Sequence, residues 1–354
     1  MLISASNSNK IRNMSLICAV LVACIHVHWA PVGVSKWMDV VFAQGIARVA
    51  VPFFFIVSGF FIGVRIGEPN WYRTALAKRI KTLLVPYLLW SLLFLIFCAF
   101  VNFIANIRAG QSMLNALRVD LRILPSAFGL ELSCHPNVVP LWYVRNLIFL
   151  VIASPMLWWL VRHLGLVWII FCFVALYANV GLIGWWANFF DHGYFSLAGI
   201  LYFSVGLRLA DGFRISARKQ KALFWLSTTV VAVSMVAKCV VGEWFNAWHL
   251  MTLTIPFLIY STWVIIPGGQ WPQWLVNCSF PIYVMHWIIL QALGLLNIPK
   301  VWAWETCFWI VCCVVPILVA ALCRRLCPRV GSWLKHTTLL DIILLLLFLK
   351  WIWI

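Results

Sequence analysis

Long apolar stretches separated by short polar segments run through almost the whole chain. About ten of them are long enough to form a helix that crosses a bilayer, which takes about 20 apolar residues. They lie at about 14–30, 47–64, 83–105, 141–161, 164–182, 194–210, 222–241, 249–267, 279–296 and 303–323. We therefore predict an all-α, polytopic membrane protein with about ten transmembrane helices in a single membrane domain over residues 1–335.

Two segments fall outside this pattern. The C-terminal tail, 336–354, is strongly apolar after Leu339 but is broken by Asp341 and Lys350, and it is short for a full span. We expect an additional interfacial or re-entrant helix there. The longest segment between spans, 106–140, is expected on the outer side of the membrane, either as a substrate-recognition lid or as an amphipathic helix on the bilayer surface.

The charged residues give this arrangement a direction. The chain is 64% apolar and 10% charged, and its formal charge of +17 comes from lysines and arginines in short clusters between the apolar stretches. Such clusters mark the cytoplasmic ends of membrane helices, and their alternation predicts that both termini are cytoplasmic. We interpret the basic balance as a topology signal, with membrane lipids as partners and no nucleic acid.

The twelve cysteines lie mostly inside apolar stretches, where cysteine behaves as a small hydrophobic residue. Cysteines and histidines nowhere show the spacing of a metal site, so we predict that the protein binds no metal. The oligomeric state is left open by the sequence.

A histidine inside the first apolar stretch is the strongest candidate for chemistry. His26 lies about 20 Å along a helix that starts near Asn13. An ionisable side chain at that depth is costly and usually functional, although a hydrogen-bonded packing role is the alternative. His28 lies roughly 200° further round the helix, so the two cannot share a cavity. His286, in the ninth stretch, lies about 10 Å from the cytoplasmic face, which predicts that it is too far from His26 in depth to be its partner.

Two arginines lie near the predicted outer surface. Arg145 is one turn into the fourth stretch, and we expect it to face the bundle interior, where it would hold an anionic or oxyanionic group. Arg48 begins the second stretch and is expected to extend to the interface, which is also the alternative for Arg145. Ser58 precedes Gly59 in the second stretch, and we expect this pair to serve close helix packing, with a nucleophilic serine as the alternative.

Cations also precede the third stretch on the predicted cytoplasmic side. The rule that positive charge stays inside explains most of them. The same group would suit a donor that carries several phosphates. Its members are Arg73, Lys78, Arg79 and Lys81.

Taken together, five segments resemble the acyltransferase family 3 proteins, bacterial membrane enzymes that acylate envelope sugars. In chain order they are LVACIHVH, PFFFIVSGFFIG, KRIKTLLVPYLLW, LWYVRNLIFLVIASP and SFPIYVMH, and the likeness extends from Asn13 to about Cys323. The resemblance implies a bacterial inner-membrane O-acyltransferase, most simply an O-acetyltransferase, that moves an acyl group from acyl-CoA to a saccharide hydroxyl. It implies a catalytic site with His26, Arg145 and His286, and acyl-CoA bound by the four cytoplasmic cations.

Two positions depart from the family pattern. Members commonly carry Arg or Lys eleven residues before the histidine, where this chain has Ser15, and Arg12, about 40° from that face, is the expected substitute. Where the cytoplasmic motif of the family has paired arginines, this chain has Lys78 and Lys81.

The alternative function is a secondary transporter or flippase for a lipid-linked or anionic saccharide, with the same charges along a translocation path. The sequence does not specify the acyl group or the acceptor sugar.

Overall fold

A computed structural model of the protein describes residues 5–110, 112, 138–179, 196–212, 215–241, 247–266, 268–296 and 298–326, and all regular elements in these ranges are helical. The all-α prediction is confirmed for that part of the chain. The tail 336–354 and most of segment 106–140 lie outside the described residues, so the predictions made for them stay predictions.

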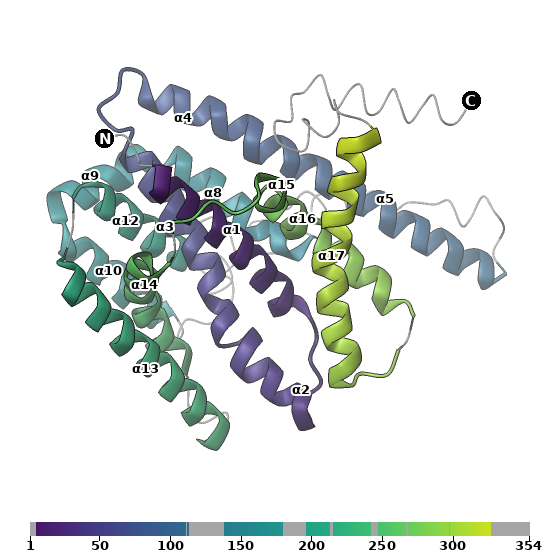
Figure 1. The fold of residues 1–354 in the computed structure, drawn as a ribbon. Helices are drawn as coiled ribbons and strands as arrows, with labels where there is room; N and C mark the ends of the chain where they lie inside the picture. Colours follow the sequence, from purple (N-terminus) through teal and green to yellow (C-terminus); the bar gives the residue numbers. More distant parts are fainter. Residues whose placement is uncertain are drawn as a thin grey trace.

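The helices form one bundle, which the long run of α4 and α5 crosses from end to end (Figure 1). In chain order the elements are α1 (Ala5–His26), α2 (Gly33–Trp37), η1 (Met38–Ala43), η2 (Ile46–Val49), α3 (Ala50–Gly63), α4 (Trp71–Arg79), η3 (Ile80–Leu84), α5 (Val85–Arg108), η5 (Val139–Leu141), α8 (Trp142–Ile152), α9 (Ser154–Leu164), α10 (Leu166–Asn179), α12 (Leu197–Ala210), α13 (Ala217–Val241), α14 (Ala247–Ile265), α15 (Gln273–Val276), α16 (Ser279–Gly294) and α17 (Trp302–Leu326).

The described parts of the predicted apolar stretches are mostly helical, but the count of about ten full spans is not confirmed. Helix α12, for example, has 14 residues and is therefore about 21 Å long, against a hydrocarbon core of about 30 Å. In the described residues, five helices are long and apolar enough to cross a membrane: Ser6–His26, Gly33–Gly63, Trp71–Arg108, Ala217–Val240 and Trp302–Arg325.

The predicted span 141–161 is two helices with a bend between them. Helix α8 ends at Ile152 and α9 begins at Ser154, and the two are bent by 69°. Pro155 lies in the first turn of α9 and has no backbone N–H, so it favours the start of a new helix over the continuation of α8. The bent pair is long and apolar enough to form one broken span.

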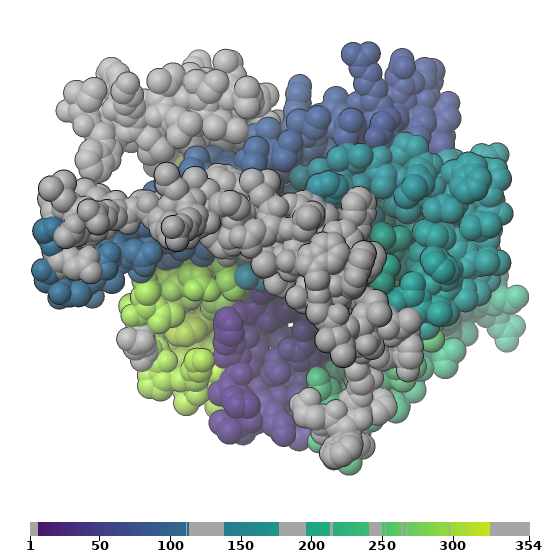
Figure 2. Space-filling model, turned by 180° about the vertical axis from the view of Figure 1, so that it is seen from behind, coloured from purple at the N-terminus to yellow at the C-terminus, as the bar shows by residue number. Residues whose placement is uncertain are grey.

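The first and last described helices lie side by side and run in opposite directions (Figure 1). At one end, Arg12 of α1 donates to Gln273 of α15 (2.9 Å), and Arg324 of α17 donates to a carbonyl of the same short helix (3.3 Å). At the other end, Glu305 of α17 accepts from the backbone of Ala30, just after α1. Figure 2 shows the purple N-terminal segment next to the yellow-green C-terminal helices. The basic ends of both helices therefore share one face, as the charge pattern predicts.

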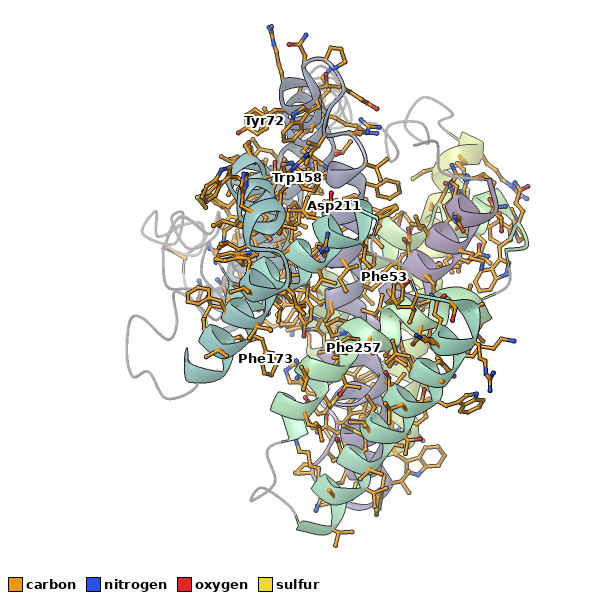
Figure 3. All side chains as sticks on the ribbon, turned by 90° about the vertical axis from the view of Figure 1, so that its left-hand side faces the viewer. Phe53, Tyr72, Trp158, Phe173, Asp211 and Phe257 are labelled. Carbon is orange, nitrogen blue, oxygen red and sulfur yellow. The ribbon has the colours of Figure 1, made fainter. Side chains whose placement is uncertain are left out.

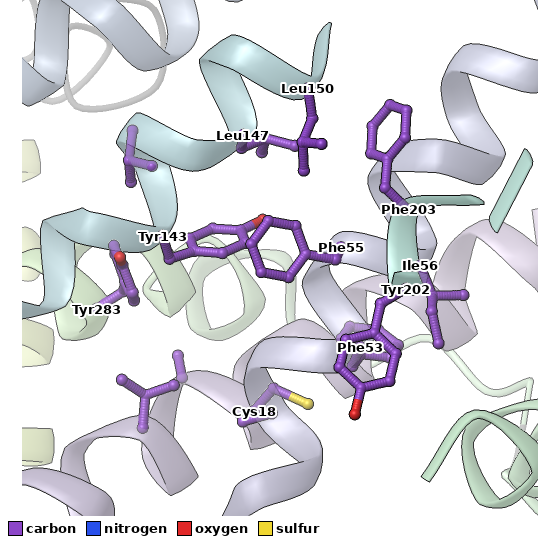
Figure 4. Packing of buried hydrophobic residues seen from close by; sticks show 14 of the residues in the cluster. Cys18, Phe53, Phe55, Ile56, Tyr143, Leu147, Leu150, Tyr202, Phe203 and Tyr283 are labelled. Atoms are coloured by element: carbon purple, nitrogen blue, oxygen red, sulfur yellow. The ribbon is translucent and has the colours of Figure 1, made fainter. Parts of the chain in front are cut away.

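Two glycines allow helices α3 and α12 to pack closely. Gly59 of α3 lies against the carbonyl of Phe203, and Gly206 of α12 lies against that of Ile56, so that a Cβ on either glycine would collide with the facing carbonyl. The prediction that this stretch serves close packing is confirmed at Gly59. The bundle interior that contains Phe53 (Figure 3) is filled around this contact by large apolar side chains (Figure 4): Phe53, Phe55, Leu147, Leu150, Tyr202 and Phe203.

Replacing Gly59 by Ala is expected to lower the Tm of the detergent-solubilised protein by several degrees. The added methyl group collides with the Phe203 carbonyl, and overpacking of this kind costs about 1–3 kcal/mol. Gly294→Ala is the control, because a Cβ at Gly294 meets nothing within 4 Å. Thermal unfolding followed by tryptophan fluorescence measures both variants, and equal Tm values would contradict the close contact.

Candidate active site

Two histidines from different helices meet inside the bundle. The ring of His26, the last residue of α1, stacks on the ring of His286 in α16, with centroids 5.3 Å apart and planes inclined by 29°. The rings of Trp287 and His26 pack in a T-shaped arrangement, with centroids 5.4 Å apart. His26 is half-buried, whereas His286 is 0% exposed. The pair therefore has one partly exposed member and one that is enclosed.

The hydrogen bonds of His286 determine which of its nitrogens can accept a proton. Its Nδ1 lies 3.0 Å from the carbonyl oxygen of Ile282, one turn earlier in α16. Because a carbonyl can only accept, Nδ1 must carry the hydrogen, which leaves the lone pair of the neutral ring on Nε2. That Nε2 is buried and has no hydrogen-bond partner among the described residues. A buried acceptor without a partner requires an explanation, and a catalytic role is one of the few available.

The prediction that His286 is too deep to be a partner of His26 is wrong. It assumed that α1 and α16 start at the same level. In the structure Gln273 of α15 lies beside Arg12, and α15 and a further turn precede Ser279, the first residue of α16. Helix α16 therefore begins partway up α1, which cancels the difference of about 10 Å estimated from counting residues.

A row of buried aromatic side chains continues from His286 into the bundle. The ring of Tyr283 lies 6.3 Å from that of His286 and 6.1 Å from that of Tyr143 in α8. The Tyr283 hydroxyl donates to the carbonyl of Pro140, and Tyr143 shares a hydrogen bond with Ser58. Figure 4 shows Tyr143 between Phe55 and Tyr283. Tyr143 and Tyr283 thus connect α8 to the histidine pair through ring contacts, and both hydroxyls are hydrogen-bonded.

The other end of this row reaches a group of cations. Arg79, at the end of α4, is half-buried and within electrostatic range of Tyr143. Arg65, which follows α3, is in turn within range of Arg79 and Lys78. Like charges held this close in the free protein repel one another, so the group favours a polyanionic ligand. The sequence predicted Lys78 and Arg79 as donor-binding residues but did not include Arg65.

The remaining two predicted donor-site cations, Arg73 and Lys81, are exposed on α4 and η3. Lys81 lies in a π-helical turn, Ile80–Leu84. Pro86 explains this turn, because proline lacks an N–H and crowds the carbonyl four residues earlier, which a wider turn relieves. Within the described part of the chain, neither Arg73 nor Lys81 is joined to the group around Arg79 by a hydrogen bond or ion pair.

The two predicted outer arginines have different environments. Arg145 in α8 is 3% exposed, and its neighbour Asn146 accepts a hydrogen bond from the backbone of Ser196 at 2.8 Å. The interior position predicted for Arg145 is confirmed. Arg48 is half-buried and donates to Gln44 through Nε at 3.1 Å. Arg145 is two residues from Tyr143, roughly 200° round the helix, so its action on the histidine pair stays a prediction.

A family profile described as an acyltransferase domain, that of acyltransferase family 3, matches residues 11–325. The chain belongs to acyltransferase family 3. It is 25% identical over 366 residues to the succinoglycan biosynthesis protein ExoH of Rhizobium meliloti (strain 1021), an alignment that covers 92% of this chain and 90% of that protein. No solved structure matches it with significance.

Membership in acyltransferase family 3 makes this membrane protein an acyltransferase. Within the described residues, no cluster of three or more His, Cys, Asp or Glu side chains has the arrangement of a metal site. Arg12, the expected substitute for a basic residue at Ser15, is exposed and donates to Gln273 at 2.9 Å, and its role stays a prediction. Ser15 itself donates back to the Ile11 carbonyl at 2.8 Å.

Sequence reasoning missed several residues of this site besides Arg65. Tyr143, Tyr283 and Trp287 could not be distinguished from other aromatic residues, which are frequent in the apolar stretches of this chain. Glu305 was also missed, although an acidic residue at the edge of a span was a usable signal. It is 2% exposed and binds the chain just after His26.

Proposed function

We propose that this protein is an inner-membrane O-acyltransferase. It would move an acyl group, most simply acetyl, from a cytoplasmic acyl-CoA to a hydroxyl of an envelope or lipid-linked saccharide. The observation that carries the proposal is the half-buried His26 stacked on the enclosed His286 in a family of acyltransferases. The name of the relative, a succinoglycan biosynthesis protein, supports a carbohydrate acceptor.

The reaction needs a base for the hydroxyl and a way to stabilise negative charge. In the proposed step the hydroxyl oxygen attacks the thioester carbonyl carbon and its proton passes to His26. The carbon–sulfur bond then breaks, and the CoA sulfur leaves with a proton as the thiol. A neutral His286 beside His26 favours this step, because two adjacent imidazoles resist being charged together. Arg145 is proposed to stabilise the negative charge on the carbonyl oxygen.

The cation group fits the donor side of this reaction. Coenzyme A carries several phosphates, and Arg65, Lys78 and Arg79 are within electrostatic range of one another. Arg79 is also within electrostatic range of Tyr143, whose ring packs against that of Tyr283 next to His286. We propose that the phosphates bind at these cations and that the thioester end points into the bundle.

Transfer of label from radioactive acetyl-CoA into membrane saccharide tests the proposed function. Membranes that contain the protein are expected to incorporate label, and membranes without it are not. Succinyl-CoA is tested in parallel, since a different acyl group leaves the reaction class unchanged. If neither donor is consumed while a labelled lipid-linked saccharide crosses the membrane, the protein is a transporter and the proposal fails.

Neutralising the donor-site cations is expected to raise the KM for acyl-CoA about tenfold, which corresponds to about 1.4 kcal/mol of lost binding free energy. The kcat is expected to stay within about twofold of the parent value. The variant replaces Arg65, Lys78 and Arg79 by Gln. A matched triple, Arg218, Lys219 and Lys221 to Gln, removes three exposed cations from the start of α13. Equal kinetics for the two triples, at equal membrane insertion, would contradict a donor site at the first group.

A further inference from the structure

One face of α17 is hydrogen-bonded through its side chains to both α1, which ends at His26, and α16, which contains His286. The Nε1 of Trp309 donates to the Val20 carbonyl of α1 at 2.9 Å, and the thiol of Cys312 donates to the carbonyl of His286 at 3.5 Å. Glu305, one turn before Trp309, binds the segment that follows α1. Residues spaced by three or four lie on one side of a helix, so the three side chains form a single contact row.

Glu305 makes the strongest of these contacts. Its Oε1 accepts from the backbone N–H of Ala30 at 2.6 Å, and its Oε2 accepts from the Ser35 hydroxyl at 2.5 Å. A carboxylate that is 2% exposed needs such donors, because an unpaired charge is costly to bury. Hydrogen bonds to an ionised group are roughly twice as strong as neutral ones. The position of Glu305 in the first turn of α17 adds the favourable end of the helix dipole.

The segment held by Glu305 begins at the catalytic candidate itself. Helix α1 ends at His26, and the chain then turns, with the Trp29 N–H bonded to the Val27 carbonyl at 3.0 Å. The last turn of a helix frays unless its end is tied down. Ala30 lies four residues beyond His26, and its N–H is the point at which Glu305 ties this end to α17.

We propose that Glu305 is a positioning residue of the acyl-transfer site. By binding the Ala30 amide and the Ser35 hydroxyl, it fixes the end of α1 and keeps the His26 ring stacked on His286. This inference rests on the proposed function for its catalytic consequence. The fixing of the helix end can be tested whether or not transfer is observed.

Two substitutions separate position from charge. Glu305→Ala removes both contacts, whereas Glu305→Gln keeps an oxygen for the Ala30 N–H and offers an NH₂ group to the Ser35 oxygen. Thr306→Ala is the control on the same turn of α17, because the Thr306 hydroxyl bonds back to Trp302 of its own helix at 2.7 Å. Hydrogen–deuterium exchange of the peptide containing residues 22–33 reports on the end of α1 without any need for activity.

The Glu305→Ala variant is expected to exchange at least about tenfold faster in this peptide, and the Gln and Thr306 variants are expected to match the parent. In the transfer assay, Glu305→Ala is expected to lose at least about tenfold in kcat with an unchanged KM for acyl-CoA, and Gln is expected to restore most of it. Unchanged exchange in Glu305→Ala would overturn the proposal, and so would faster exchange with unchanged kcat. If the parent transfers no acyl group, the proposed function fails, and the exchange data alone then decide whether Glu305 fixes the helix end.

Discussion

Replacing His26 by Ala is expected to lower acyl transfer by about 1,000-fold, within the range for loss of a positioned general base. His26 is the half-buried member of the histidine pair, and an acceptor hydroxyl can therefore approach its ring. The measurement is the initial rate of label transfer from acyl-CoA into saccharide, at equal amounts of folded protein in the membrane.

His28→Ala is the matched control for this prediction. His28 lies two residues further along the chain, is exposed, and is expected to tolerate the change with less than about a twofold loss of rate. A His26→Ala enzyme that kept its rate would reduce His26 to a packing residue, and the enclosed His286 would then be the residue to test as the base.

The likeness to acyltransferase family 3 and the apolar pattern were readable from the sequence, because both depend on local order along the chain. The described parts of these stretches are mostly helical, and the burial of Arg145 followed from its place one turn inside such a stretch. The length of the spans was less predictable. Pro155 divides one stretch into two helices, and a short apolar helix cannot be told from a full span by hydropathy alone.

The resemblance placed His26 and His286 in one catalytic site, but their direct stacking could not be predicted by counting residues, because it depends on where α16 begins relative to α1. That level is determined by α15 and by the bond between Arg12 and Gln273, which is a contact between residues at opposite ends of the chain. Residue counting gives depth along one helix but not the offset between two. The partners of Glu305 could not be predicted for the same reason, since Ala30 and Ser35 come from the N-terminal part of the chain.

Replacing Arg145 by Ala is expected to lower kcat about 100-fold with little change in the KM for acyl-CoA. This is the usual loss when one donor to a developing oxyanion is removed, and the effect appears in kcat because the negative charge exists in the transition state and not in the bound donor. Arg145 is 3% exposed, so water cannot readily take the place of its guanidinium. Arg145→Lys is expected to recover part of the rate, since a buried ammonium keeps the charge but not the planar pair of donors.

Arg48→Ala is the matched control for Arg145→Ala. Arg48 bonds to Gln44 near the start of α3 and is half-buried, so its loss is expected to change kcat by less than about threefold. Size-exclusion profiles and Tm values of the detergent-solubilised variants separate a catalytic loss from misfolding, because a buried arginine also contributes to packing. Equal, mild losses for Arg48→Ala and Arg145→Ala would assign Arg145 to packing and leave the oxyanion to be stabilised by another donor in the bundle.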